Sequence, residues 1–361
     1  MIRVFHVITH FDMGGAENVA INIAKSQSDE YEYHLIEVER ATGAFSDSLI
    51  SELKRDGIRL HRSWIKNGKL AILLFWIKFL FLIVRWKPNV IHTHTEKPDM
   101  ALYIWHSLFG WIFPHIKYIR TIHNTQLWND WKNIGKYVEA FFIKHHSNVA
   151  ISSSTQECYH KTFGGIVPPI IYNGLPEVVQ EKFEGVDSSK INILFAGRLE
   201  PQKGVDIMIK VFEKFASDEQ FRFFIVGNGS LSERVRTSLN KYKRITIIDK
   251  VFGLSRYLAS FDYLFMPSVH EGLALMSIEA SMAKVPIIIN DCPGLKDTLP
   301  ETWELSAHNN NFEDYERIFS SLYKMDRKLL GLKAYQYAKA NFSMEKMQRA
   351  YEAKYKQICG F

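Results

Sequence analysis

Two glutamates eight residues apart, Glu271 and Glu279, lie around the expected start of a helix. The run 263–265 has the residues of a buried strand, Pro267 ends it, and a helical apolar pattern follows from Leu273. A strand that turns directly into a helix aims free backbone N–H groups at an anion, most often a phosphate. Carboxylates on both sides could accept hydrogen bonds from hydroxyls flanking a bound diphosphate, which suits a nucleotide-sugar. Since an acid near a helix N-terminus also favours the helix dipole, a structural role stays open.

A second candidate site is the loop 197–204, which follows the strand expected at 191–195. It places Arg198 and Lys203 five residues apart. Arginine binds phosphate through a planar fork and lysine acts as a compact point charge, so the two together could neutralise a diphosphate. The alternative is a surface loop with two solvated bases.

Two further loops follow strands expected near the N-terminus. After the strand 4–9, Gly14 and Gly15 would let the backbone approach a ligand closely, although the dinucleotide-binding spacing GxGxxG is not present there. His123 follows the strand 116–122, at the loop position where α/β proteins bind ligands. His92 and His94 lie on one face of a short strand, but with no third ligand in a matching context we expect a satisfied polar strand end and no metal site.

The elements that would position these residues repeat the order strand, glycine-containing loop, helix. The order occurs in both halves of the chain, which predicts an α/β fold with two Rossmann-like, doubly wound domains facing a central cleft. Residues 1–176 would form the N-terminal domain and residues 191–342 the C-terminal domain. The polar stretch 177–190 would link them, and 343–361 would be a terminal helix.

Composition limits the possible functions. The chain has 361 residues, 47% of them hydrophobic, and a formal net charge of +6, which fits anionic substrates or an acidic membrane surface and is too weak to indicate nucleic acid. Three scattered cysteines indicate a reducing compartment, and the first residues resemble a strand and not a secretory leader. We therefore expect a cytoplasmic protein.

The segment 70–84 is almost entirely apolar and has basic residues at both ends, within 66–87. Three interpretations are open: a helix buried against the sheet, a helix lying on an anionic membrane surface, or a membrane span. Fifteen residues are fewer than the roughly 20 that a span requires. A helix with one exposed edge would satisfy the first two interpretations together.

Taken together, these motifs resemble the retaining glycosyltransferases of the GT-B fold, family 4, and among them the capsular and exopolysaccharide enzymes. The resemblance covers nearly the whole chain and rests on motifs in the family's order: Gly14-Gly15-Ala16-Glu17, Gly197-Arg198, Lys203-Gly204, Pro267-Ser268 and Glu271 with Glu279. It implies that the C-terminal domain binds the donor, that the N-terminal domain binds the acceptor, and that the last helix crosses back to the N-terminal domain.

The resemblance also implies roles for individual residues. Arg198 and Lys203 would hold the diphosphate, Glu279 the ribose, and Glu271 with the backbone of 272–274 the transferred sugar. His123 corresponds to the family's histidine beside the sugar. The full set implied is catalytic Glu271, Arg198, Lys203 and His123, and donor-binding Gly15, Gly197, Val251, Gly272, Leu273, Ala274, Leu275 and Glu279. Asp249 and Lys284 depart from the family, which commonly has glycine at both positions.

The family mechanism transfers the sugar with retention of configuration through front-face attack. No Asp-x-Asp triplet occurs in the sequence, so we expect a metal-independent reaction that uses a UDP-sugar or GDP-sugar donor and no cofactor. The acceptor would be a glycan or a lipid-linked oligosaccharide. Two alternatives stay open: an NAD(P)-dependent oxidoreductase, for which Gly227-Asn228-Gly229 is followed by Ser232 where a third glycine is needed, and a non-catalytic scaffold docked on a membrane.

Overall fold

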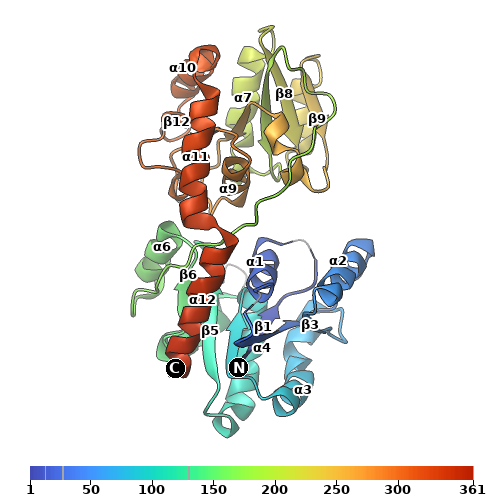
Figure 1. The fold of residues 1–361 in the computed structure, drawn as a ribbon, viewed down its shortest axis with the longest axis vertical. Helices are drawn as coiled ribbons and strands as arrows, with labels where there is room; N and C mark the ends of the chain where they lie inside the picture. The colour runs from blue at the N-terminus through green and yellow to red at the C-terminus, as the bar shows by residue number, and fades with distance from the viewer. Residues whose placement is uncertain (13, 27, 129–130, 361) are drawn as a thin grey trace. The chain divides into compact units, whose positions relative to one another are not determined.

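The chain folds into two compact units, each built around one parallel sheet (Figure 1). The computed structural model describes residues 1–12, 14–26, 28–128 and 131–360, and the parts of our predictions that fall on positions 13, 27, 129–130 and 361 lie outside them. The N-terminal unit contains Met1–Gly174 and Met344–Phe361, and the C-terminal unit contains Leu175–Ser343.

The N-terminal unit has the sheet order β3-β2-β1-β4-β5-β6, with every pair parallel. Its elements are β1 (Ile2–Ile8), α1 (Gly15–Ala24), β2 (Tyr31–Glu37), α2 (Ala44–Arg55), β3 (Arg59–His61), α3 (Gly68–Trp86), β4 (Val90–Thr93), α4 (Glu96–Phe109), η1 (Gly110–Ile112), β5 (Lys117–Ile122), α5 (Lys132–Lys144), β6 (Asn148–Ala150), α6 (Ser153–Phe163) and α12 (Met344–Cys359).

The C-terminal unit repeats this arrangement in the order β12-β11-β10-β7-β8-β9. Its elements are β7 (Ile191–Ala196), η2 (Pro201–Lys203), α7 (Val205–Phe215), β8 (Phe221–Val226), α8 (Ser232–Leu239), β9 (Ile245–Ile248), η3 (Leu254–Arg256), η4 (Leu258–Ser260), β10 (Tyr263–Met266), α9 (Leu275–Met282), β11 (Ile287–Asn290), η5 (Lys296–Thr298), β12 (Ser306–Ala307), α10 (Phe312–Ser321), η6 (Leu322–Lys324) and α11 (Arg327–Phe342).

The expected pair of doubly wound α/β units is confirmed. Central strands such as β7, β8 and β11 are almost wholly buried because helices cover both faces of a parallel sheet, which explains their near-continuous apolar sequences. In each unit the strand order reverses between the first and fourth strands, namely β1 and β4, or β7 and β10. Ligands of open α/β sheets bind beside the carboxyl ends of the strands at such a reversal point.

The last helix, α12, packs on the N-terminal unit although it lies more than 300 residues from β1 in sequence (Figure 1). Met347, Tyr351 and Tyr355 of α12 join the core formed by β1, β2 and α1. The expectation that the terminal helix crosses back to the first domain is therefore confirmed.

Residues 177–190, expected to be a polar linker, are attached to the C-terminal unit. The Glu181 N–H donates to the Arg256 carbonyl over 2.6 Å, and the Phe183 ring contacts the Phe261 ring at a tilt of 45°, with centroids 5.2 Å apart. The sequence pattern did not reveal this attachment because it depends on two scattered apolar residues, Phe183 and Val186, and on hydrogen bonds to residues 255–260.

The apolar helix α3 has two different faces. One packs on the sheet through residues including Phe75, Phe79 and Ile83. The other leaves Leu73 58%, Ile77 46% and Phe81 66% exposed. Within the described residues, we find no helix whose length and apolar character would let it cross a bilayer.

Candidate active site

The two loops singled out in the C-terminal unit follow adjacent strands, β7 and β10, at the reversal point of the sheet. Hydrogen bonds hold the loops together: the Val269 N–H donates to the Gln202 carbonyl over 2.8 Å, and the Gln202 side-chain amide donates to the His270 carbonyl over 3.0 Å. Gln202 was not among the predicted residues. Its position inside the charged loop is the only sequence signal that could have indicated this role.

The contact between the loops brings one predicted cation and one predicted carboxylate together. The Lys203 Nζ lies 2.5 Å from the Glu271 Oε1, with side chains 20% and 9% exposed. Arg198, in the same loop as Lys203, is exposed. The site therefore combines a half-buried ion pair with a guanidinium that is accessible to an anion.

The helix after this turn begins later than the sequence predicted. Helix α9 begins at Leu275, whereas 272–274 form a loop in which the Ala274 N–H donates to the Gly294 carbonyl over 3.0 Å. Leu273 and Ala274 are buried, and Leu275 is partly exposed as the first residue of the helix. The loop after β11 therefore holds this backbone out of the helix, so that Glu271 and Gly272 precede the N-terminus of α9 by three to four residues.

Glu279 lies in the second turn of α9. Part of its side chain is accessible, but protein atoms surround the carboxyl group, and this burial raises the pKa of Glu279 to about 7. A carboxyl group that is partly protonated near neutral pH can accept hydrogen bonds from hydroxyls and also donate one to them.

Glycines allow the close approach of the backbones around this site. Gly204 has a φ of 68°, and a Cβ atom on it would lie 1.9 Å from the Pro267 carbonyl oxygen. Gly294 has a φ of 76°, and a Cβ there would lie 2.0 Å from the Glu271 carbonyl oxygen. Sequence reasoning did not include Gly294, although the Pro-Gly dipeptide at 293–294 is a turn signal.

The remaining predicted positions of this unit lie around β7, β8 and β9. Gly197 follows β7, and a Cβ on Gly227 would lie 1.8 Å from the Gly197 carbonyl oxygen, so the glycines after β8 serve close packing of these loops. Val251 is half-buried after the edge strand β9. Asp249, where the family commonly has glycine, pairs with Arg236 at 2.5 Å. Lys284 has a φ of 60° at the end of α9, the left-handed region that glycine adopts most easily.

In the N-terminal unit, Gly15 is the first residue of α1 and Gly14 precedes it in an extended conformation. The Glu17 side chain folds back over this turn, since a Cβ on Gly14 would lie 2.1 Å from the Glu17 Oε2. The carboxylate therefore lies beside the N-terminus of α1, where the helix dipole favours negative charge.

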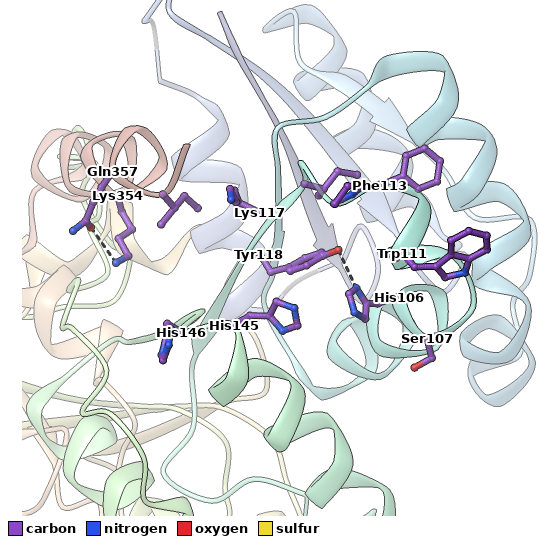
Figure 2. Close-up of a pocket in the computed structure, with 14 residues that line it drawn as sticks. His106, Ser107, Trp111, Phe113, Lys117, Tyr118, His145, His146, Lys354 and Gln357 are labelled. Carbon is purple, nitrogen blue, oxygen red and sulfur yellow. Dashed lines mark hydrogen bonds between the residues drawn. The ribbon is translucent and has the colours of Figure 1, made fainter. Parts of the chain in front are cut away.

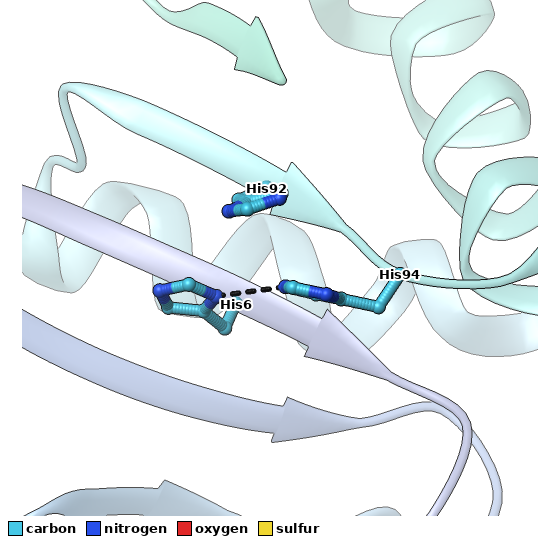
Figure 3. A group of neighbouring side chains, drawn as sticks. All are labelled: His6, His92 and His94. Atoms are coloured by element: carbon cyan, nitrogen blue, oxygen red, sulfur yellow. Dashed lines mark hydrogen bonds between the residues drawn. The ribbon is translucent and has the colours of Figure 1, made fainter. Parts of the chain in front are cut away.

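His123 lies in the loop after β5 and is connected to other histidines. Its Nε2 lies 3.4 Å from the His94 Nδ1. Figure 3 shows the next contact, in which the His94 Nε2 lies 2.9 Å from the His6 Nδ1. Contrary to our expectation, a third histidine does lie beside His92 and His94, because β1 and β4 are neighbours: ring nitrogens of His6, His92 and His94 come within 4.8 Å of one another.

A shared metal would need a free lone pair from each ring. Both nitrogens of His6 and of His92 already have hydrogen-bond partners, as do both of His94. The three rings therefore form a hydrogen-bonded cluster. Burial keeps the rings neutral, because it lowers the pKa of His6 and of His123 to about 3.

A cavity of about 840 Å³ lies elsewhere in the N-terminal unit. Its lining includes Trp111, Lys117 and Lys354, and His106, which is hydrogen-bonded to the Tyr118 hydroxyl at 3.0 Å (Figure 2). Lys117 is the first residue of β5, so the cavity borders the amino end of that strand and not the carboxyl end where α/β ligands bind. No predicted site residue lines it.

Two Rossmann-like units, each with one reversal of its strand order, match the GT-B fold of solved glycosyltransferase structures. The solved structure of Anabaena HepE in complex with UDP and glucose has this fold, with a TM-score of 0.77 and 16% identity over 98% of this chain and 99% of that one. Residues 190–324 match the family described as glycosyl transferases group 1, and residues 13–177 match glycosyltransferase family 4. The chain belongs to these glycosyltransferases.

Two bacterial proteins are similar to this chain over most of its length. A 41.2 kDa protein of the cps region of Klebsiella pneumoniae is 28% identical over 66% of this chain and 71% of its own length. The capsular polysaccharide biosynthesis glycosyltransferase CapH of Staphylococcus aureus is 25% identical over 78% of this chain and 79% of its own. Capsule-related glycosyltransferases are thus among the proteins to which this chain is similar.

Proposed function

We propose that the protein is a retaining, metal-independent glycosyltransferase of bacterial surface polysaccharide biosynthesis. It would move a sugar from a nucleoside-diphosphate sugar, such as a UDP-sugar or GDP-sugar, to a glycan or a lipid-linked oligosaccharide. The observation that carries the proposal is the Lys203–Glu271 pair, which links the loops after β7 and β10 at the reversal point of the C-terminal sheet. The UDP and glucose in the HepE complex support a donor of this kind.

The proposed chemistry follows from charge. Cleavage of the sugar–phosphate bond leaves a diphosphate with additional negative charge, which fixed cations and oriented N–H groups stabilise without reorganisation. Arg198 and Lys203 would take this role together with the backbone of 272–274, while Glu271 would bind the sugar and Glu279 the ribose. His123 and the Gly15 amide of the N-terminal unit would contact the sugar and the phosphate, and Gly197, Leu275 and Val251 would complete the donor contacts.

The acceptor side of the proposal rests on α3. Its exposed apolar face and the basic residues within 66–87 suit an anionic membrane surface, where lipid-linked acceptors are available. We propose that the protein works at the cytoplasmic side of the cell membrane as a peripheral protein.

A ligand panel tests the proposal directly. Thermal unfolding is measured with UDP, GDP, ADP and TDP, with EDTA present throughout. A nucleotide at 100 times its Kd should stabilise the protein by about 2.7 kcal/mol, because only the folded state binds it. The matching sugar nucleotide is then assayed for transfer, and the anomeric configuration of the product is read by NMR. An inverted product, or turnover that EDTA abolishes, would contradict the proposed mechanism, and no stabilisation by any nucleotide would contradict the function.

A further inference from the structure

A continuous chain of hydrogen bonds runs through the N-terminal unit from α12 to His123. It crosses the sheet at the reversal point and uses side chains from β1, β4, β5 and α12. In order, its members are Tyr351, Thr121, His92, Tyr355, His6, His94 and His123. We call this set the histidine chain.

The contacts of the histidine chain form a single file. Tyr351 Oη and Thr121 Oγ1 lie 2.7 Å apart, and Thr121 Oγ1 lies 2.7 Å from His92 Nε2. Tyr355 Oη then bridges His92 Nδ1 at 2.8 Å and His6 Nε2 at 3.5 Å. Two ring-to-ring contacts, His6 Nδ1 to His94 Nε2 at 2.9 Å and His94 Nδ1 to His123 Nε2 at 3.4 Å, complete it.

Each member has one proton to contribute, because burial keeps the rings neutral. Burial lowers the pKa of His6 and His123 to about 3, and the pKa of His92 and His94 also falls well below its ordinary value. A neutral imidazole donates through one nitrogen and accepts through the other. Where Thr121 and Tyr355 each accept one hydrogen bond and donate one within the chain, all the hydrogen bonds run in the same direction, and two such arrangements exist. A bridging hydroxyl that accepted from both sides would leave its own buried proton without an acceptor in the chain, at the cost of one unmade hydrogen bond.

The two arrangements differ at the end formed by α12. If Tyr351 donates to Thr121, every donor in the chain has an acceptor, and all four histidines carry their proton on Nδ1. In the opposite direction all four carry it on Nε2, and the Tyr351 hydroxyl proton has no acceptor among the described residues. Tyr351 is fully buried, so that loss disfavours the second arrangement by roughly tenfold. His123, at the other end of the chain, is partly exposed, so water can form the outer hydrogen bond of its ring in either arrangement.

We propose that Tyr355 is a positioning residue which transmits this direction from Thr121 and His92 to His6, so that His123 presents its Nδ1–H as a hydrogen-bond donor to a substrate oxygen. The inference rests on the proposed function for the contact with substrate, but the tautomer itself does not depend on that function. It gives α12 a role beyond packing, because the helix supplies the hydroxyl that connects His92 to the other three histidines.

The tautomers are measured by ¹⁵N NMR of the imidazole nitrogens in the full-length protein without substrate, with single His→Gln variants for assignment. We expect Nδ1–H at His6, His92, His94 and His123. Nε2–H at His123, or an even mixture in the wild-type protein, overturns the inference and leaves the glycosyltransferase proposal intact. This measurement needs no variant of the hydrogen-bonded tyrosines to fold.

A matched pair of variants tests the role of Tyr355. Tyr355→Phe removes the only hydroxyl between His92 and His6, so His123 should become a mixture of tautomers, and kcat/KM should fall by about two- to tenfold, the range of one neutral hydrogen bond. Tyr351→Phe removes an equally buried hydroxyl one turn earlier. In that variant the reversed direction would leave the buried Thr121 proton without an acceptor among the described residues, so Thr121 still donates to His92. The variant should keep Nδ1–H at His123 and wild-type kcat/KM. An unchanged tautomer in Tyr355→Phe, or equal losses of kcat/KM in both variants, would disprove the positioning role.

Discussion

At the scale of single residues, the Lys203–Glu271 ion pair is the feature on which the proposed chemistry depends. Replacing Lys203 with Ala should lower kcat by about tenfold to a thousandfold, the effect of losing one group that stabilises developing charge. Replacing Arg198 with Ala should lower kcat by a factor of the same order. Steady-state kinetics with the donor identified by the nucleotide panel provide the measurement.

The controls for Lys203→Ala separate chemistry from folding. Because the pair is only partly buried, removing the ammonium leaves the Glu271 carboxylate without its partner at a cost of about 1–3 kcal/mol in the free energy of unfolding, the range for one unsatisfied polar group. Adding Glu271→Gln should recover that stability but not the activity. Lys214→Ala removes an exposed lysine of α7 that is paired with Glu316 at 2.6 Å, and it should change neither the free energy of unfolding nor kcat. Turnover by Lys203→Ala close to that of the wild type would refute the assignment.

Glu279 gives a prediction about pH. Its folded-state pKa of about 7 lies above the ordinary value of 4.5, so the folded protein binds the proton more tightly than the unfolded chain does. This carboxyl therefore destabilises the fold progressively as pH rises from about 4.5 to 7. Glu279→Gln should remove that dependence and raise the free energy of unfolding at pH 8 relative to the wild type, by on the order of 1–3 kcal/mol. Urea denaturation at pH 5 and pH 8 measures it, and parallel pH profiles of the two proteins would be incompatible with the raised pKa.

The candidate residues could be found from sequence, but their contacts could not. Arg198, Lys203, Glu271 and Glu279 were identified because charged residues followed expected strands. Lys203 and Glu271 are 68 residues apart, and their contact depends on β7 and β10 being neighbours, which no local pattern encodes. The third histidine, His6, was missed for the same reason, because its proximity to His92 is set by the pairing of β1 with β4.

At the scale of elements, a buried ion network anchors the segment that carries His123. The Arg120 side chain on β5 lies 2.7 Å from Asp99 of α4 and 2.7 Å from Glu139 of α5, and all three are almost fully buried. Glu139 also accepts hydrogen bonds from Trp128 and Tyr159, each at 2.6 Å. The network thus fixes both ends of the connection between β5 and α5.

Breaking this network should destabilise the N-terminal unit strongly. Glu139→Gln leaves the Arg120 guanidinium with one carboxylate fewer in a buried site, at an expected cost of about 3–5 kcal/mol. Denaturant unfolding followed by tryptophan fluorescence reports the change, since Trp128 contacts Glu139 directly. Glu157→Gln, which removes an exposed partner of Lys161, is the control and should leave the unfolding midpoint in place. Similar midpoints for both variants would show that the buried network does not carry this stability.

The elements themselves were predictable to the extent that each has a local cause. Apolar runs predicted the strands expected at 116–122 and 191–195, which are β5 and β7, and the terminal helix expected at 343–361 is α12, all close to their observed bounds. The short edge strand β3 was missed because three partly exposed residues carry no apolar signal. The late start of α9 was missed because a hydrogen bond that the Ala274 N–H donates to the Gly294 carbonyl of a distant loop decides it.

At the scale of the whole molecule, the surface of α3 determines how the protein would meet a membrane. The exposed apolar residues of α3 recur at intervals of three and four, so they form one stripe along the helix: Leu70, Leu73, Ile77, Phe81 and Val84. Lys78, the one charge within the apolar run, turns away from this stripe and donates to the Arg62 carbonyl. Leu108 at the end of the neighbouring helix α4, and Trp111 and Ile112 of the following turn η1, are exposed as well.

This surface predicts binding to anionic vesicles that weakens with salt. The apolar stripe would enter the interface while the basic residues within 66–87 and the net charge of +6 attract acidic headgroups, a contribution that rising ionic strength screens. Phe81→Glu should reduce vesicle binding by about tenfold or more, because it removes a large apolar side chain and adds a repelled charge. Val179→Glu introduces the same charge at a site that is 85% exposed in the other unit, and it should bind like the wild type. Co-sedimentation with phosphatidylserine-containing and neutral vesicles distinguishes these outcomes. If the wild type ignored both kinds of vesicle, or if both variants bound equally well, α3 would not be a membrane-binding surface, and a water-soluble glycan would become the preferred acceptor.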